Sequence, residues 1–380
     1  MRDMEGEYHL KTICYYVSDY GFGHAARSIA VIRFLCRVRK DIRVIICTSF
    51  AYSFMNASLK QLIVQRQVSM RQVRNDMGYI LKRDSLIPDN ELLRKEYDAF
   101  VHRMSESVEE EIEFLRNCKA DLVIGDIPPI PFKAAHLLSI HSIGISNFTW
   151  YTAYRDALSE KELQPLFDCY TQMDDFFALP GSQERPWGQK RNRAFGFFSR
   201  CTETEDVRSI QTRVNPEGSK KIIFFGLGMK IETEDLTAYP LWKSKNCVFI
   251  VSNHTHVEGD NIYKIPSGYN ETQNFIAASD VVISKPGWGT IAEAVCTNKP
   301  LVLVARENVT EDRNTINYLQ RHNGCELVKW ESLKDYQLLP ERLSDLKKPK
   351  KTKAFDSYFN LSILVNEITA VLDNRALKTF

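Results

Sequence analysis

The sequence lacks the features of an exported, membrane-bound or polyanion-binding protein. Its nine cysteines form no CxxC pair and several lie inside apolar runs, which indicates reduced core thiols rather than disulfides or a zinc site. No apolar run approaches the roughly 18 residues of a membrane-spanning helix, and residues 1–12 carry acids instead of the apolar core of a signal peptide. The formal net charge of +2 gives no broad field for nucleic acid. We therefore expect a cytoplasmic protein with no transmembrane segment and no nucleic-acid partner.

Several familiar nucleotide and metal motifs are missing as well. The chain contains no DxD motif, which would hold a metal-bound diphosphate, and no GK[ST] of a phosphate-binding P-loop. Gly21 and Gly23 lack the third glycine and the acidic residue about 20 positions later that mark a dinucleotide site. We therefore expect no metal and no cofactor, and a Rossmann-type dehydrogenase is the least favoured function.

The 380 residues are enough for two domains at about 150 residues each. Short β-branched runs alternate with amphipathic stretches, a pattern typical of a parallel sheet covered by helices on both faces. In the first half, helices are expected at 25–38, 91–117 and 131–138, and strands at TICYYV, IRVIICT, ADLVIGD and HSIGIS. The pattern restarts after residue 199 with KKIIFFGLG, NCVFIVSN, NIYKIP, SDVVISK, PLVLVA and CELVKW.

A segment rich in Pro, Gly and charge at 180–200 separates the two halves. We therefore predict an α/β protein with two doubly wound Rossmann-like domains, at 1–198 and 199–355, followed by a segment at 356–380. The last segment contains a helix, Asn360 to Asn374, with apolar residues on one face. The basic run KKPKKTK before it is either a solvated loop or a site for an acidic partner.

The stretch SDYGFGHAARS, Ser18 to Ser28, lies where the first strand turns into a helix, at the sheet edge that binds ligands in open α/β folds. Gly21 and Gly23 allow a ligand to approach the main chain, and a helix N-terminus favours anions. His24 and Arg27 project from the first turn, so Gly21, Gly23 and Arg27 are candidate phosphate contacts and His24 is a candidate catalytic base. The alternative is an ordinary tight turn.

A second strand, glycine turn and helix occur in SDVVISKPGWGTIAEAV, where Gly287 and Gly289 precede a helix expected near Thr290. Glu293 lies one helical turn further on and can present a carboxylate to a ribose diol. The alternative for Glu293 is an exposed helix acid. The next loop, ARENVTEDRN, contains polar groups suited to sugar hydroxyls: Glu307, Asn308, Glu311, Asp312 and Asn314.

These segments, together with DLVIGDIPPIPFKAA, ISNFTWYTAY, DDFFALPG and GFFSR, resemble the glycosyltransferase-like N-terminal half of L-arabinokinases and their stand-alone relatives. That group is distantly related to the N-acetylglucosaminyltransferase that forms lipid II, and both have GT-B architecture. The resemblance covers most of residues 12–335. Nothing in the sequence resembles the phosphate loop of the kinase half, so sugar kinase activity is not expected.

The resemblance implies that a nucleotide sugar binds mainly to the second domain and that the final helix crosses back to the first. The implied contacts are the diphosphate at Gly287, Trp288, Gly289 and Thr290, the ribose at Glu293, the base at Ile265 and Pro266, and the sugar at Glu311 and Asp312. His24 is implied to face the anomeric carbon from across the cleft.

The acceptor side is less defined. Asn147 and Trp150, in SNFTW, could hold an acceptor or form a packed aromatic corner. Asp126, in the GDIPP turn, is a second catalytic or acceptor-side candidate, and its alternative is a turn-capping aspartate. The acceptor loop and membrane-docking patch of the lipid II enzyme have no recognisable counterpart, so a polyprenyl acceptor is not supported.

The expected activity is metal-independent transfer of a sugar from a nucleotide diphosphate sugar, UDP-linked, to an acceptor hydroxyl or amine. His24 would act as general base or contact the diphosphate, while two helix N-termini stabilise the leaving group. Two alternatives stay open. One is a nucleotide-sugar hydrolase or epimerase on the same fold, and the other is a non-catalytic protein that binds a nucleotide sugar.

Overall fold

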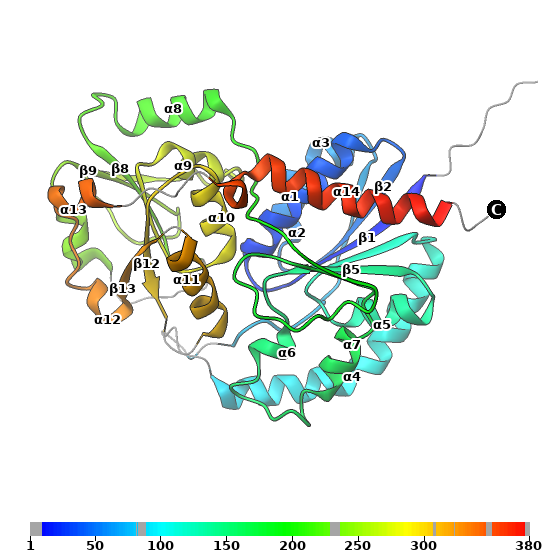
Figure 1. Cartoon of the computed structure of the whole chain (residues 1–380). Helices are drawn as coiled ribbons and strands as arrows, with labels where there is room; N and C mark the ends of the chain where they lie inside the picture. The colour runs from blue at the N-terminus through cyan, green and yellow to red at the C-terminus, as the bar shows by residue number, and fades with distance from the viewer. Residues whose placement is uncertain are drawn as a thin grey trace, which may run out of the picture.

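The computed structural model describes residues 10–80, 82, 89–228, 236–306, 309–322, 324–346 and 352–376. Glu307 and Asn308 of the predicted sugar loop, and most of the basic run before the last helix, lie outside these residues. The described chain forms two α/β domains side by side, with one long helix running from one domain onto the other (Figure 1).

The first domain contains a sheet of seven parallel strands in the order β3-β2-β1-β4-β5-β6-β7. Its central strands are buried on both faces, as expected where helices cover both sides of a parallel sheet. The four predicted strands are present. The strands are β1 Lys11–Val17, β2 Ile42–Cys47, β3 Val68–Arg71, β4 Leu122–Asp126, β5 His141–Ser146, β6 Asp175–Ala178 and β7 Arg191–Ala194.

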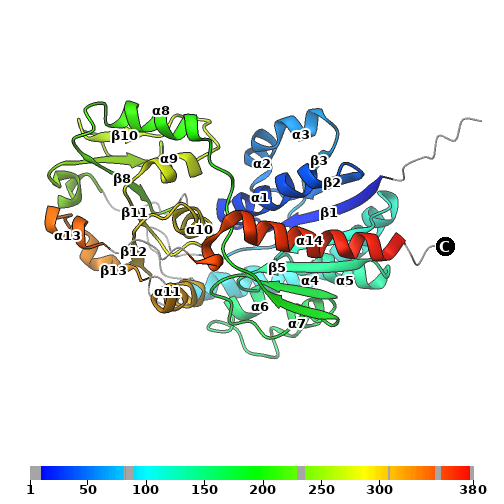
Figure 2. The same ribbon diagram turned by 45° about the horizontal axis from the view of Figure 1, so that its top comes forward.

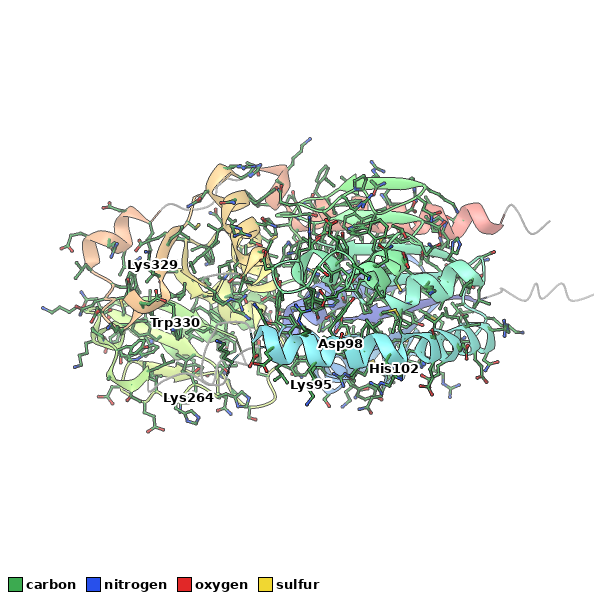
Figure 3. The ribbon with its side chains drawn as sticks, turned by 90° about the horizontal axis from the view of Figure 1, so that it is seen from below. Lys95, Asp98, His102, Lys264, Lys329 and Trp330 are labelled. Carbon is green, nitrogen blue, oxygen red and sulfur yellow. The ribbon has the colours of Figure 1, made fainter. Side chains whose placement is uncertain are left out.

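The helices of the first domain include the three that the sequence predicts. The longest, α4, turns Lys95, Asp98 and His102 outward, as Figure 3 shows, while Leu93 and Tyr97 are buried beneath it. This is the amphipathic pattern of a helix that packs on a sheet. The helices are α1 Phe22–Val38, α2 Tyr52–Ser58, α3 Lys60–Val64, α4 Asn90–Asn117, α5 Ile130–Leu137, α6 Trp150–Ala153 and α7 Gln164–Tyr170.

The second domain repeats the architecture with six parallel strands in the order β10-β9-β8-β11-β12-β13. All six predicted strands are present: β8 Lys221–Gly226, β9 Cys247–Val251, β10 Ile262–Lys264, β11 Val281–Ser284, β12 Leu301–Ala305 and β13 Glu326–Lys329. The helices are α8 Thr204–Val214, α9 Gln273–Ala278, α10 Trp288–Cys296, α11 Thr310–His322, α12 Trp330–Leu333 and α13 Pro340–Asp345, with 3-10 turns η1 Leu236–Ala238, η2 Pro240–Lys243 and η3 Lys353–Phe355.

The last helix, α14 Ser357–Ala376, returns to the first domain and packs against α1, as predicted (Figures 1 and 2). Its carboxylates pair with arginines of that domain: Arg191 Nη1 lies 2.9 Å from Glu367 Oε2, and Arg39 Nη1 lies 2.8 Å from Asp373 Oδ1. Its apolar face is buried at Leu361, Leu364, Val365, Ile368, Val371 and Leu372. Among the described residues, none of the helices combines the length and the apolarity needed to cross a bilayer.

The two segments that cross between the domains are hydrogen-bonded to each other. The Phe197 N–H donates to the Ala354 carbonyl at 2.8 Å, and the Ser199 N–H donates to Ser357 Oγ at 2.9 Å. The Asn360 amide donates to the Phe197 carbonyl at 3.0 Å. The domain boundary near residue 198 stays a prediction, and it falls inside this paired crossing.

Candidate functional site

The two predicted glycine turns meet where the domains face each other. Both turns follow the carboxyl end of a central strand, β1 or β11, and open α1 or α10. Gly21 has φ 75°, a conformation that favours glycine. A Cβ on Gly289 would lie 3.0 Å from Cα of Gly23, so a side chain there would push the two turns apart. The structure therefore brings both helix N-termini to one place between the domains.

His24, in the first turn of α1, is 6% exposed and its ring is held by Asp126 at the end of β4. His24 Nδ1 lies 2.9 Å from Asp126 Oδ1. Strands β1 and β4 are neighbours in the sheet, so two residues about 100 positions apart in the chain reach the same edge. The Asp126 carboxylate is buried under His24 and Arg27 and pairs with both side chains. It therefore differs from the turn-capping aspartate that the sequence left open as an alternative.

Arg27 lies one helical turn after His24 and is also directed at Asp126. Its Nε donates to Asp126 Oδ2 at 2.6 Å, its Nη1 donates to Asn147 Oδ1 at 2.7 Å, and its Nη2 donates to Asp126 Oδ1. With its side chain 3% exposed, Arg27 holds the Asp126 carboxylate in place. The sequence predicted that Arg27 contacts a phosphate. In the structure its N–H groups are directed into the first domain.

These bonds indicate which ring nitrogen of His24 carries the proton. Arg27 Nη2 has two hydrogens, and its acceptors are Asp126 Oδ1 and, at 3.1 Å, Ser146 Oγ. His24 Nδ1 is then the donor to Asp126, although it also lies 2.9 Å from Arg27 Nη2. The Nε2 atom is left with a lone pair that can take a proton.

The charges around Asp126 keep it ionised. Burial alone would raise the pKa of this carboxyl, but the Arg27 guanidinium and then His24 lower it below its ordinary value. An ionised Asp126 favours the Nδ1–H form of His24 and would stabilise an imidazolium if the ring gained a proton.

Across the domain interface, Glu311 in the first turn of α11 approaches the same cluster. Asn147 Nδ2 donates to Glu311 Oε1 at 3.5 Å, which links the two domains. Burial and then Asp312 raise the pKa of Glu311, while His24 and Arg306 oppose the shift. Asp312 itself is fully buried and accepts from Arg306 Nε and Nη2 at 2.5 Å each. Of the two predicted sugar contacts, Glu311 therefore reaches Asn147 of the first domain, whereas Asp312 anchors Arg306.

Trp150 occupies the packed aromatic corner that the sequence left open as an alternative. Its ring is 1% exposed, stacks on Tyr154 at 5.3 Å and donates from Nε1 to Asp76 Oδ2 at 2.8 Å. Burial raises the pKa of Asp76 to about 6. Tyr79 packs edge-on against Trp150 with the ring centroids 5.4 Å apart, and its buried hydroxyl has no hydrogen-bond partner among the described residues.

On the donor side, Glu293 is buried in α10 rather than exposed. Its Oε1 accepts from Arg200 Nη2 at 2.8 Å and from Nε at 3.1 Å. Arg200 also donates to the Asn270 carbonyl at 2.6 Å and to Thr272 Oγ1 at 3.0 Å. Glu293, the predicted ribose contact, is thus oriented through Oε1. Its Oε2 is the candidate atom to bind a ribose diol.

The remaining donor residues divide between packing and exposed positions. Trp288 is a packing residue, because its ring contacts Phe197 at 5.3 Å and its Nε1 donates to the Pro180 carbonyl at 3.1 Å. Ile265 is buried directly after β10, whereas Pro266 is exposed. Gly287 caps α10 in an extended conformation and Thr290 is half-buried in its first turn.

Sequence reasoning missed Lys285, which lies in the same donor region. A Cβ on Gly228 would meet Lys285 Cε at 2.8 Å, so the lysine side chain lies across the glycine turn that follows β8. This places a cation between that turn and the α10 N-terminus. The signal in the sequence was a lysine directly between a strand and a PGWG turn.

Sequence reasoning also missed Asp19, which shapes the first glycine turn. Its Oδ1 accepts from the Ser49 N–H at 2.7 Å and from the Phe50 N–H at 2.9 Å, and its Oδ2 accepts from the Asn75 N–H at 2.6 Å. Asp19 therefore ties the turn after β1 to those after β2 and β3.

No group of three or more His, Cys, Asp or Glu side chains in the described part of the chain could hold a metal ion.

Comparison with known proteins was made on sequence and on structure. Residues 250–360 match the glycosyltransferase family 28 C-terminal domain. The L-arabinokinase of Arabidopsis thaliana is 27% identical over 341 residues, which are 83% of this chain and 30% of that protein. The chain therefore spans less than a third of that relative. The UDP-N-acetylglucosamine–N-acetylmuramyl-(pentapeptide) pyrophosphoryl-undecaprenol N-acetylglucosamine transferase of Flavobacterium psychrophilum is 21% identical over 281 residues, covering 70% of this chain and 73% of that one.

Among solved structures, UGT89C1 of Arabidopsis thaliana superposes with a TM-score of 0.63 at 15% identity, covering 94% of this chain and 98% of that one. UGT89C1 has also been solved in complex with UDP and with UDP-L-rhamnose. The predicted resemblance and the GT-B architecture are confirmed.

Proposed function

We propose that this protein is a glycosyltransferase that transfers a sugar from a UDP-linked donor to a hydroxyl or amine of an acceptor without a metal ion. The observation that carries the proposal is the buried His24–Asp126 pair, held beside the N-terminus of α10 where the two domains meet. A general base and an anion site then lie on opposite sides of one interface, as transfer between two substrates requires.

On the acceptor side, His24 Nε2 would take the proton of the attacking group. Asp126 fixes the ring through Nδ1 at 2.9 Å and stabilises the imidazolium that forms. Arg27 keeps Asp126 oriented and ionised. Nucleophilic attack on the anomeric carbon would then proceed with the nucleotide diphosphate as leaving group.

On the donor side, the diphosphate would lie at Gly287 to Thr290, with Lys285 as a cation beside it. Glu293, oriented by Arg200, would hold the ribose diol, while Ile265 and Pro266 border the base. UDP is the favoured nucleotide for two reasons. One relative is a UDP-N-acetylglucosamine transferase, and UGT89C1 has been solved in complex with UDP. Glu311, which is hydrogen-bonded to Asn147 beside Arg27, would contact the transferred sugar.

The test is a panel of UDP-, GDP-, TDP- and CMP-sugars in thermal denaturation of the full chain. A ligand at 100 times its Kd stabilises by about 2.7 kcal/mol, so we expect UDP and one or more UDP-sugars to raise the Tm. Failure of every nucleotide to do so would refute the proposal. Incubation of the stabilising UDP-sugar without acceptor tests for hydrolysis, because a hydrolase would release free sugar at its full rate.

The Glu293→Gln variant keeps the shape of the side chain but removes its charge. We expect it to weaken UDP binding by about 1–3 kcal/mol, the range for a lost charged hydrogen bond. The Lys285→Met variant should weaken UDP binding while leaving uridine binding unchanged, because Lys285 lies beside Gly287, where the diphosphate is proposed to bind. Calorimetry with UDP and uridine checks both, and unchanged UDP affinity in both variants would remove this placement of the donor.

Metal independence gives a separate prediction. The α10 N-terminus and Lys285 would supply positive charge at the proposed position of the leaving diphosphate. Turnover should therefore persist in excess EDTA, measured with the UDP-sugar that the panel selects. Loss of activity in EDTA, with recovery on addition of magnesium or manganese, would contradict it.

A further inference from the structure

Two cysteines that lie 104 positions apart in the chain meet beside the central sheet of the first domain. Cys14 is in β1, and Cys118 directly follows α4 in the turn that leads to β4. Their Sγ atoms are 3.5 Å apart. The parallel pairing of β1 with β4, in which Ile13 lies opposite Leu122, fixes this approach.

The two thiols differ in their surroundings. Cys14 is fully buried, whereas Cys118 is partly exposed. Arg43, on the neighbouring strand β2, donates from Nη2 to the Cys118 carbonyl at 3.3 Å and to Thr12 Oγ1 at 3.1 Å. Its buried Nε–H has no hydrogen-bond partner within the described part of the chain. A cation with an unused donor therefore lies beside the more accessible thiol.

The pKa values of the two thiols are shifted in opposite directions, in agreement with their different surroundings. The hydrogen bond from Cys14 and the nearby Arg43 guanidinium lower the pKa of Cys118, although burial opposes them. The same hydrogen bond and burial raise the pKa of Cys14. The thiolate, which is the nucleophile in thiol oxidation, therefore forms first on Cys118.

We propose that Cys14 and Cys118 are a redox-active pair that a peroxide converts into a reversible disulfide. The Cys118 thiolate attacks one peroxide oxygen, the O–O bond breaks, hydroxide leaves, and Cys118 becomes a sulfenic acid. The Cys14 sulfur then attacks the Cys118 sulfur, the S–O bond breaks, and water leaves with the Cys14 proton. Two thiols are oxidised by two electrons and one hydrogen peroxide is reduced to two waters.

The geometry needs only a small movement. A disulfide bond is about 2.05 Å long, so the sulfurs at 3.5 Å must approach by about 1.5 Å, within reach of a side-chain rotation. The disulfide would tie β1 to the turn that leads into β4, and β1 and β4 are already adjacent. The bond would form without rearranging the sheet.

The experiment treats the full chain with hydrogen peroxide, blocks free thiols with iodoacetamide and maps the peptides by mass spectrometry. We expect one cross-linked peptide joining Cys14 to Cys118, about 2 Da lighter than the two thiol peptides, and its loss after dithiothreitol. Cys201 is the matched control, because it is exposed and the described structure gives it no thiol neighbour. Peroxide-treated protein in which Cys14 and Cys118 are both alkylated, while Cys201 is oxidised, would overturn the proposal.

Two variants test the order of attack. In Cys14→Ala, Cys118 should stop at the sulfenic acid and be labelled by dimedone, whereas in Cys118→Ala no label should appear on Cys14. A link from either cysteine to Cys47, which lies on the adjacent β2, would refute the assignment of the pair. The wild-type peptide map decides the main point even if a variant does not fold.

Discussion

Replacing His24 by alanine should lower turnover by a factor of about 100 to 10,000, the range for loss of a general base. The reason is that His24 Nδ1 pairs with Asp126, so Nε2 is the proton acceptor of the proposed reaction. UDP affinity should stay within about twofold of the wild type, because the proposed donor contacts lie on the second domain. The measurement is kcat with the UDP-sugar that stabilises the protein, together with calorimetry for UDP.

A matched control comes from His102, which is exposed on the outer face of α4 (Figure 3). His102→Ala should leave both turnover and UDP affinity unchanged. Near-normal turnover in His24→Ala would make the histidine an ordinary turn residue. A parallel fall in UDP affinity would instead identify it as a diphosphate contact.

The second large effect is expected at Asp126. In Asp126→Asn, the Arg27 guanidinium keeps its charge but loses the carboxylate, and its side chain is only 3% exposed. Removing one partner of a buried pair costs about 3–5 kcal/mol, because it leaves an uncompensated charge. Turnover should fall as well, because His24 loses the acceptor that orients its ring.

Asp126 also gives a pH dependence with a defined sign. The pKa of its carboxyl is lower in the folded protein than in the unfolded chain, so the unfolded state binds the proton more tightly. The stability advantage of the wild type over Asp126→Asn is therefore complete above the unfolded value, about 3.9, and is lost as the pH falls through the folded pKa. Denaturant unfolding at several pH values measures it.

Two further variants separate charge from function. Arg27→Met added to Asp126→Asn removes the unpaired cation and should recover part of the stability, but not the turnover. Asp373→Asn is the control, because Asp373 forms an exposed pair with Arg39 and should change stability by less than about 1 kcal/mol. A fully stable Asp126→Asn would contradict the buried pair as described.

The fold could be predicted because its central strands are apolar runs. β1, β2, β4 and β5, and all six strands of the second sheet, stand out from the amphipathic helices around them. β6, DFFA, was missed. β3, VSMR, and β7, RNRA, were missed because polar residues interrupt them. An exposed edge strand of that composition carries no hydrophobic signal, so its segment resembled a linker.

The site was predicted as residues but not as pairs. His24, Arg27 and Asp126 were each singled out, yet only the order β1-β4 brings them into one network. In the same way an exposed helix acid stayed open as the alternative for Glu293, because the sequence does not show that Arg200, 93 positions earlier, packs against it. Ion pairs between distant segments depend on topology, which local periodicity does not encode.

The paired crossing at Phe197–Ser199 and Ala354–Ser357 has a mechanical consequence. Because the chain passes between the domains twice at one place, the two halves are joined by a double tether. If the contacts at the glycine turns break, neither half can diffuse away, and a cut in one crossing leaves the other intact. The two halves thus keep a high effective concentration toward each other, so reclosure of the interface between them is an intramolecular step.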